Sequence, residues 1–308
     1  SAYSAITPSV ISTNATFSGP LFVAQDVTVS PSNQLNLTGE IKFAPNVKIV
    51  IENGAGLVIS NAHLLACGSD MWDGIVVKNG GNITANGIGG NNLIEDAKIA
   101  VSLPNTSSAS FVGNVLLSGT TFNKNYISLS ISNYSLPPSS PQQVHISECV
   151  FTCRDLPFTL TSWPQTGTVN TTSSYSADLR AEILPLTGLA APFMAQTGYP
   201  IINLKNPYSN QTSQTAIQLI NVGNTTGNAT NSVNIGHPFN PAYFNLFDAQ
   251  NIGIYALNSN LASFNNVFQN SQNLNSPGVG IKAINNFGNG FVYNSMLTLN
   301  LPAVLNPN

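Results

Sequence analysis

The sequence has very few charged residues. Asp, Glu, Lys and Arg make up 7% of its 308 residues, whereas soluble domains usually carry about 25%. The formal net charge is −3 and there is no cluster of Lys or Arg, so we expect no nucleic-acid partner. No apolar run approaches the roughly 20 residues that a membrane-spanning helix needs, and we expect no membrane span.

Cysteine is equally scarce. The chain has three cysteines, Cys67, Cys149 and Cys153, which are too few for a disulfide framework and lack the paired spacing of a zinc site. One bridge with a leftover thiol and three buried thiols both remain open. No other thiol or histidine lies at ligand spacing from Cys149 and Cys153, so we expect no metal and no other cofactor.

Signals for helices are almost absent. Gly and Asn interrupt the sequence every few residues, and no long window has the apolar period of a helix. Short apolar runs alternate instead with polar corners, which predicts strands at 35–38, 41–44, 47–52 and 57–60. The 42 Asn residues suit such corners, because Asn tolerates left-handed backbone and stacked Asn side chains pair in ladders.

Two sequence patterns recur along the chain. DAKIAVSL (Asp96–Leu103) resembles DAQNIGIYAL (Asp248–Leu257), and VGIKAIN (Val279–Asn285) follows IGIYALN (Ile252–Asn258) by 27 residues. The second pattern places Phe before a polar tail, as in TTFNKN, NLFDAQN and NVFQN. Units of about 20 to 27 residues cannot bury their apolar faces alone, but a stack of them forms a continuous core.

Three all-β architectures compete for this pattern. A β-sandwich requires hairpin signals every 8 to 12 residues, and the runs between the NG pairs here are shorter. A propeller requires a period of roughly 40 residues or more. We therefore predict an all-β parallel solenoid with one large loop excursion.

Four stretches resemble a known family. IKFAPNVKIVIENGAGLVISNAHLLACGSDMWDGIVV, NLIEDAKIAV, TTFNKNYISLSI and GIYALNSNLASFNNVFQN are similar to secreted, pectin-lyase-like repeat proteins of Bacteroidota that are substrates of type IX secretion. The resemblance covers about 20–153 and 215–295. It implies a right-handed parallel β-helix and a secreted or cell-surface location. No sorting domain follows Leu301, so we expect it to have been cleaved or to lie outside this chain.

The chain divides into four expected regions. Residues 1–34 form an N-terminal cap or an exchanged strand segment, and residues 35–154 form β-helix rungs. Residues 155–214 are a Pro, Ser and Thr-rich excursion, and residues 215–308 form further rungs and a C-terminal cap. Loops carried on a rigid stack often bind ligands. The candidate ligand or partner surface on this excursion comprises Trp163, Tyr175, Arg180, Tyr199 and Tyr208.

The window from Cys67 to Val77 contains the densest group of reactive side chains. Its strand GIVV resembles GIYAL and GIKAI, which favours architecture over catalysis. We expect Cys67 to be buried, Met71 and Trp72 to pack at a corner, and the two aspartates to bond to nearby backbone N–H groups.

Polysaccharide cleavage requires two carboxylates about 5 to 10 Å apart. Asp70 and Asp73 are expected on opposite faces of a strand, and so are Glu95 and Asp96. Elimination on uronates requires a basic side chain, and the chain has only two arginines. We therefore expect no catalytic residue.

Two functions remain. The first is a non-catalytic extracellular structural or adhesive protein whose terminal strands join copies of itself head-to-tail into a filament. The alternative is a β-helix protein that binds or degrades polysaccharides, with cell-surface or extracellular glycans as its partners.

Overall fold

The computed structural model describes twelve stretches of the chain, namely residues 4–6, 9–86, 92–104, 113–134, 144–156, 201–223, 233–237, 244–269, 272–273, 276–285, 291–293 and 296–298. Within these stretches the protein consists of strands, turns and bends, and has no helix. The strands form three sheets of nine, seventeen and two strands.

The nine-stranded sheet contains β2 (Val10–Ile11), β5 (Val27–Val29), β7 (Lys48–Ile51), β9 (Trp72–Val77), β12 (Ala97–Pro104), β15 (Ile127–Ser132), β18 (Thr215–Ile220), β21 (Ile252–Leu257) and β26 (Val279–Ile284). The seventeen-stranded sheet contains β1 (Ser4–Ile6), β3 (Ala15–Ser18), β4 (Leu21–Val23), β6 (Gln34–Phe43), β8 (Gly56–Ala66), β10 (Asn82–Asn86), β11 (Asn92–Glu95), β13 (Val115–Ser118), β14 (Thr120–Asn123), β16 (Val144–Ser147), β17 (Val150–Thr152), β19 (Val233–Ile235), β20 (Leu246–Asp248), β22 (Leu261–Phe264), β23 (Val267–Gln269), β27 (Phe291–Tyr293) and β28 (Met296–Thr298). The small sheet pairs β24 (Gln272–Asn273) with β25 (Ser276–Pro277).

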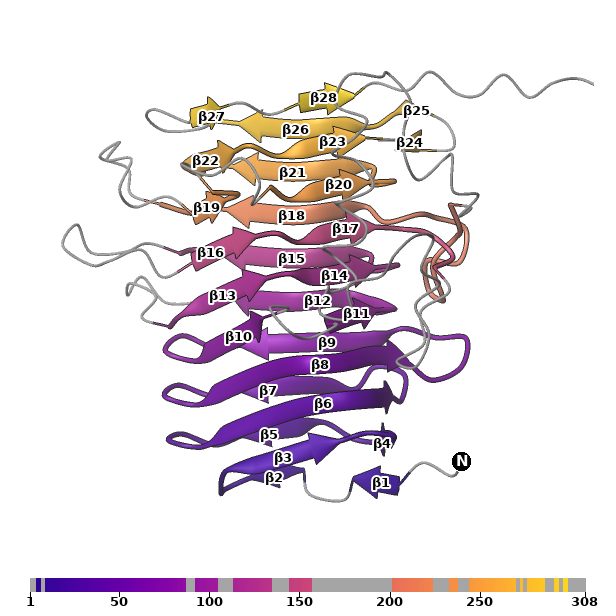
Figure 1. Cartoon of the computed structure of the whole chain (residues 1–308), viewed down its shortest axis with the longest axis vertical. Helices are drawn as coiled ribbons and strands as arrows, with labels where there is room; N and C mark the ends of the chain where they lie inside the picture. The colour runs from indigo at the N-terminus through magenta and orange to yellow at the C-terminus, as the bar shows by residue number, and fades with distance from the viewer. Residues whose placement is uncertain are drawn as a thin grey trace, which may run out of the picture.

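Strands of the two large sheets pair in parallel with the equivalent strand of the next unit. From β9 to β23 the chain returns to the nine-stranded sheet at every third strand, and two strands of the larger sheet follow each time. We call one such set of three strands, for example β12, β13 and β14, a rung. Successive rungs lie on one another in chain order (Figure 1). The expectation of an all-β protein with parallel strands is confirmed, and the arrangement is consistent with a β-helix or another solenoid-like fold.

The sequence repeats become neighbours in this arrangement. Strand β21 pairs in parallel with β26, with Ile252 opposite Val279, so the 27-residue echo is one rung. The Phe pattern also aligns, because Phe122, Phe151, Phe247 and Phe268 lie on four consecutive strands of the larger sheet. Their rings stack with centroids 4.6 to 5.1 Å apart, and all four are buried.

The first two predicted strands are in fact one. Residues 35–38 and 41–44 were expected as separate strands, but β6 runs from Gln34 to Phe43 and pairs with β8 along its length. Gly39 adopts a φ of 73°, and the register shifts between Leu37 and Gly39. The glycine therefore bends the strand without ending it, because the neighbouring strand continues to accept its hydrogen bonds.

Asparagine residues form the corners, as the composition predicts. Asn133, Asn221 and Asn258 each follow a strand of the nine-stranded sheet and have φ between 49° and 54°. Asn221 Nδ2 donates to Asn133 Oδ1 at 3.0 Å, and Asn258 Nδ2 donates to Asn221 Oδ1 at 3.1 Å. The ladder connects consecutive rungs without any charge.

Most side chains described for the window from Cys67 to Val77 pack in the core or pair with a neighbouring strand. Met71 and Trp72 are fully buried, and Trp72 stacks on Phe43 with ring centroids 4.2 Å apart. The prediction that Cys67 is buried is wrong: it is exposed, because it lies in the turn just after β8 ends. Asp73 forms an ion pair with Lys98 at 2.8 Å rather than the expected backbone contact.

All three cysteines are free thiols. Cys149 and Cys153 are buried, as one of the two open alternatives requires, while Cys67 departs from it. Cys149 packs in the main core, and Cys153 packs with Met71, Leu204 and Ala249 in a small separate cluster.

Candidate functional site

The most concentrated group of charges among the described residues lies at one corner of the stack. Glu95 ends β11 opposite Asn123 at the end of β14, so the next residues, Asp96 and Lys124, occupy the same corner position on consecutive rungs. Both corner residues have positive φ, 60° for Asp96 and 54° for Lys124. The corner geometry therefore repeats and directs the side chains of neighbouring rungs toward one another.

Lys124 bridges the two carboxylates. Its Nζ lies 3.0 Å from Glu95 Oε2 and 3.7 Å from Asp96 Oδ1. Glu95 and Asp96 are only 6% and 2% exposed. The expectation that consecutive Glu95 and Asp96 point to opposite faces is wrong, because alternation holds only in extended backbone and Asp96 is left-handed.

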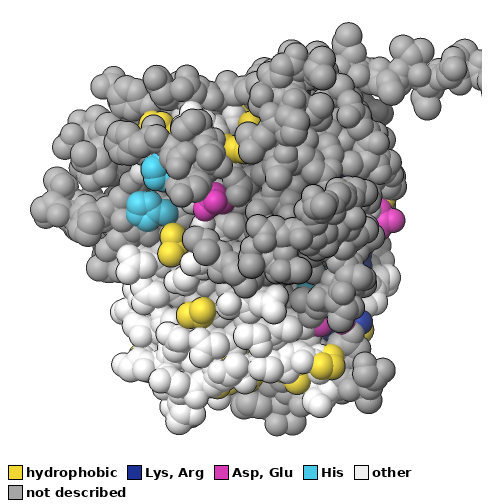
Figure 2. Space-filling model, viewed as in Figure 1, with side chains coloured by type: hydrophobic (Ala, Val, Ile, Leu, Met, Phe, Trp, Pro, Cys, Tyr) yellow, Lys and Arg dark blue, Asp and Glu magenta, His cyan; other side chains and the backbone are white. Residues whose placement is uncertain are grey.

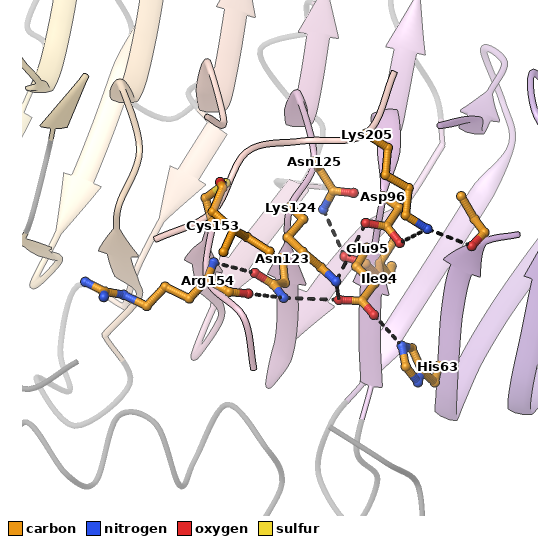
Figure 3. Close-up of polar contacts among 12 residues, drawn as sticks. His63, Ile94, Glu95, Asp96, Asn123, Lys124, Asn125, Cys153, Arg154 and Lys205 are labelled. Carbon is orange, nitrogen blue, oxygen red and sulfur yellow. Dashed lines mark hydrogen bonds and ion pairs between the residues drawn. The ribbon is translucent and has the colours of Figure 1, made fainter. Parts of the chain in front are cut away.

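Two further side chains, His63 and Lys205, complete the ionic cluster, which we define as His63, Glu95, Asp96, Lys124 and Lys205 (Figure 3). Lys205 comes from the end of the 155–214 excursion, and its Nζ lies 2.8 Å from Asp96 Oδ2. The same Nζ donates to the carbonyl oxygen of Ala66 at 3.0 Å. The ammonium group of Lys205 therefore anchors the excursion on the stacked strands.

His63 and Asn123 hold Glu95 from the other sides. His63 Nε2 lies 2.8 Å from Glu95 Oε1, and because an ionised carboxylate only accepts, Nε2 is the donor. Asn123 Nδ2 donates to Glu95 Oε2 at 3.1 Å. His63 is buried, and its Nδ1 has no hydrogen-bond partner among the described residues.

Burial and pairing separate the two carboxyl groups chemically. Burial by itself raises the pKa of Glu95, but the hydrogen bond from His63 and the charge of Lys124 outweigh it and lower the pKa from 4.5 to about 2. Burial and the neighbouring Glu95 charge raise the pKa of Asp96. Burial lowers the pKa of Lys124, but the two carboxylates prevail and raise it.

A second buried ion pair lies at the exit to the excursion. Arg154 Nε and Nη2 contact Asp248 Oδ2 and Oδ1 at 2.7 and 3.1 Å, and Thr152 Oγ1 donates to Asp248 Oδ2 at 2.7 Å. Asn123 Nδ2 donates to the carbonyl oxygen of Arg154 at 3.1 Å. Arg154 also forms an antiparallel bridge with Ile201, so both ends of the excursion meet at this corner.

The ionic cluster is not arranged for polysaccharide hydrolysis. That reaction requires two carboxyl groups that reach the same sugar from opposite sides. Glu95 and Asp96 are close enough in space, but both are buried and already paired with cations. Within the described stretches, no group of three or more His, Cys, Asp or Glu side chains is positioned to hold a metal ion.

Four of the five residues predicted as a ligand or partner surface lie outside the described residues: Trp163, Tyr175, Arg180 and Tyr199. The fifth, Tyr208, is half-buried and stacks in parallel on Tyr126, with ring centroids 3.7 Å apart. Burial and then the neighbouring Tyr208 raise the pKa of Tyr126.

Sequence reasoning missed Lys124 and Lys205. The repeat pattern could have indicated Lys124. Asp96 in EDA and Lys124 in NKN each directly follow a strand of the repeated type, so they occupy equivalent positions in successive repeats. No comparable signal exists for Lys205, which lies in a segment without the repeat pattern.

The described part of the surface in Figure 2 carries little charge. In Figure 2 the described atoms over the N-terminal strands are mostly uncharged, with scattered hydrophobic side chains. No helix in the described part of the chain has the length and apolarity of a membrane span. Comparison with protein-family models, with curated proteins and with solved structures found no significant match to this chain.

Proposed function

We propose that the chain is a non-catalytic, secreted or cell-surface protein with a right-handed parallel β-helix, which assembles head-to-tail into a filament or adhesive structure. The observation that carries this proposal is the position of the exposed hydrophobic side chains. Val10 is 52% exposed on β2, and Val279 and Ile284 are 39% and 36% exposed on β26. These strands are the two ends of the nine-stranded sheet.

Strand edges at the two ends of a stack favour pairing with another chain. The two end strands carry apolar side chains, and a parallel stack presents unlike edges at its two ends. Contact between unlike ends that continues the stack along its own axis does not close into a ring, so repetition of it gives an open fibre. Leu116 on β13, the fourth large hydrophobic side chain exposed among the described residues, lies away from these ends at 38% exposure.

The pairing of charges supports a structural role. Seven acidic side chains of the described residues form ion pairs with Lys, Arg or His: Asp26, Glu40, Glu52, Asp73, Glu95, Asp96 and Asp248. A carboxyl group held in this way is not free to act on a bound sugar. The resemblance of the repeats to secreted proteins of Bacteroidota supports the location and type IX secretion as part of the same proposal.

Negative-stain electron microscopy of the full chain tests the assembly. We expect fibres from the native chain and none after deletion of residues 1–18 or after Val10→Lys, which places a charge on the end strand. Leu116→Lys is the matched control, because it adds the same charge on the side of the stack and should leave the fibres intact. Fibres that persist with Val10→Lys would contradict the proposal.

One observation favours glycan binding as a second function. Tyr126, just before β15, and Tyr208 of the excursion form a stacked aromatic pair that is only half-buried, and a partly exposed aromatic ring is a surface on which a sugar can pack. Tyr208→Ala should then weaken retention on a polysaccharide column, with Tyr255→Ala as the control on β21. The same panel of plant and algal polysaccharides, followed for new reducing ends or unsaturated products, should show no cleavage.

A further inference from the structure

In the ionic cluster, the amine of Lys124 lies against two buried carboxyl groups whose pKa values are shifted in opposite directions. Lys124 Nζ lies 3.0 Å from Glu95 Oε2 and 3.7 Å from Asp96 Oδ1. Buried ion pairs seldom stabilise a fold more than apolar residues of the same volume do. The filament proposed above makes no use of this cluster.

Glu95 is placed to take a proton from Lys124. The contact between Nζ and Oε2 is within hydrogen-bond distance, which is the geometric requirement for a general base. His63 and Asn123 orient the carboxylate from its other sides. Transfer of the proton turns a buried ion pair into a neutral amine and a neutral acid, and a desolvated neutral lysine is a nucleophile. Because pairing lowers the pKa of Glu95 and raises that of Lys124, the neutral pair is a minor form, and the reaction it permits is slow and occurs once in each folded chain.

Asp96 is placed to receive the attack. Its Oδ1 faces Lys124, while its Oδ2 lies 2.8 Å from Lys205 Nζ. An ammonium group at that position stabilises the negative charge that develops on Oδ2 when a nucleophile adds to Cγ. Burial also raises the pKa of Asp96, so its carboxylate readily accepts a proton that Lys124 delivers through Glu95, and the neutral carboxyl group is the form open to attack.

We propose that Lys124 and Asp96 condense to form an intramolecular isopeptide bond. The Nζ–Cγ bond forms and the Cγ–Oδ1 bond breaks. The lysine ammonium brings three protons: one stays on the amide nitrogen, and two pass through Glu95 to Oδ1, which leaves as water. Glu95 is regenerated, Oδ2 becomes the amide oxygen facing Lys205, and no oxidant or reductant takes part.

The bond joins two consecutive rungs. Asp96 follows β11 and Lys124 follows β14, and these strands pair in parallel. The packed sheet therefore holds the two side chains next to each other. The reaction does not have to wait for two free groups to meet, which lowers its entropic barrier. This inference does not depend on the proposed filament, because it concerns a single chain.

Intact mass spectrometry of the denatured full chain tests the proposal. We expect the mass to be lower than that of the sequence by one water molecule. Tandem mass spectrometry after proteolysis should recover one branched peptide in which Lys124 is joined to Asp96. The variants Lys124→Arg and Glu95→Gln should regain the full mass, the first by removing the nucleophile and the second by removing the base.

Lys98→Arg is the matched control, because Lys98 forms an ion pair with Asp73 that is partly exposed, and this variant should still lose one water. Circular dichroism identifies any variant that fails to fold, and the wild-type mass decides the question without the variants. The full sequence mass in the folded wild-type chain would overturn the proposal. So would a water loss located elsewhere, such as a cyclised Asp73 or a bond from Lys205.

Discussion

At the scale of single residues, Glu95 shows how burial and pairing compete. Burial alone raises its pKa, yet His63 and Lys124 lower it to about 2. The folded state therefore binds a proton on Glu95 more weakly than the unfolded chain does. Asp96 behaves in the opposite sense. Because its pKa is raised in the folded state, its contribution to stability is greatest below pH 3.8 and is lost as the pH rises through the pKa of the folded state.

The pKa of Glu95 predicts a loss of stability in acid. Its contribution is fully present above pH 4.5 and is lost as the pH falls toward 2. A tenfold change in proton affinity is worth about 1.4 kcal/mol, so the loss is roughly 3 kcal/mol. Chemical denaturation between pH 2 and pH 7 should show this drop in Lys124→Arg, which keeps a cation beside Glu95 and cannot form the proposed bond. The double variant Lys124→Arg/Glu95→Gln should give a flatter curve.

Two variants separate these carboxyl groups further. In the same Lys124→Arg chain, Asp96→Asn should remove the opposing contribution of Asp96 and make the loss of stability in acid steeper. Identical slopes for Lys124→Arg with and without Glu95→Gln would show that Glu95 is not the group that titrates.

Position 74 in β9 has no room for a side chain larger than that of glycine. Its φ is 97°, and a Cβ atom there would overlap the carbonyl oxygen of Ile99 on β12. Gly74→Ala should lower the free energy of unfolding by more than about 2 kcal/mol, because strain and overlap add. Gly68→Ala is the control, with a φ of 82° and no atom within 4 Å of the new Cβ.

Thermal or chemical denaturation of both glycine variants makes this comparison. Only backbone strain affects Gly68→Ala, so its cost should stay near 1 kcal/mol. Equal costs for the two variants would mean that the overlap with Ile99 has no energetic effect.

At the scale of elements, the phenylalanine ladder connects four consecutive strands. Phe151 of β17 lies between Phe122 of β14 and Phe247 of β20, with ring centroids 5.1 and 4.9 Å away. Each strand supplies one ring at the same register position, so the apolar side chain that closes one rung also supports the next. Continuity along the stack therefore depends on each ring in the interior of the ladder.

Phe151→Ala should create a cavity between the rings of Phe122 and Phe247, because both pack against the side chain that is removed. Large-to-small changes of this kind cost about 3 to 5 kcal/mol. Phe151→Leu, which keeps much of the volume, should cost roughly 1 to 2 kcal/mol, since it mainly removes the ring stacking. The midpoint of urea denaturation measures both changes, and a Leu variant as unstable as the Ala variant would contradict the cavity explanation.

At the scale of the whole molecule, the rung is the unit of construction. Ile252 of β21 pairs with Val279 of β26, so the segment 252–278 spans one repeat. Its removal brings VGIKAI into the place of IGIYAL beside β18, with the same alternation of apolar side chains. In a stack each unit contacts only its neighbours, so stability is approximately a sum over units.

Deletion of residues 252–278 should therefore leave a folded chain with a lower melting temperature. Deletion of residues 252–264, about half a rung, is the control and should prevent cooperative folding, because it shifts every later strand away from its sheet. Far-ultraviolet circular dichroism with temperature distinguishes the two. A half-rung deletion that melts like the full-rung deletion would argue against the rung as the unit.

The sequence by itself determined the class of fold and its period. Three local patterns carry this information: the absence of helix periodicity, the 27-residue repeat and the Asn corners. Parallel pairing between equivalent strands of successive repeats follows from them. The tertiary structure alone decided the ionic cluster. Left-handed backbone at Asp96 turned its carboxylate inward with that of Glu95, and Lys205 reached it from a segment without repeats. The direction of a side chain at a corner and the landing point of a long excursion are set by contacts between distant residues, which no local pattern records.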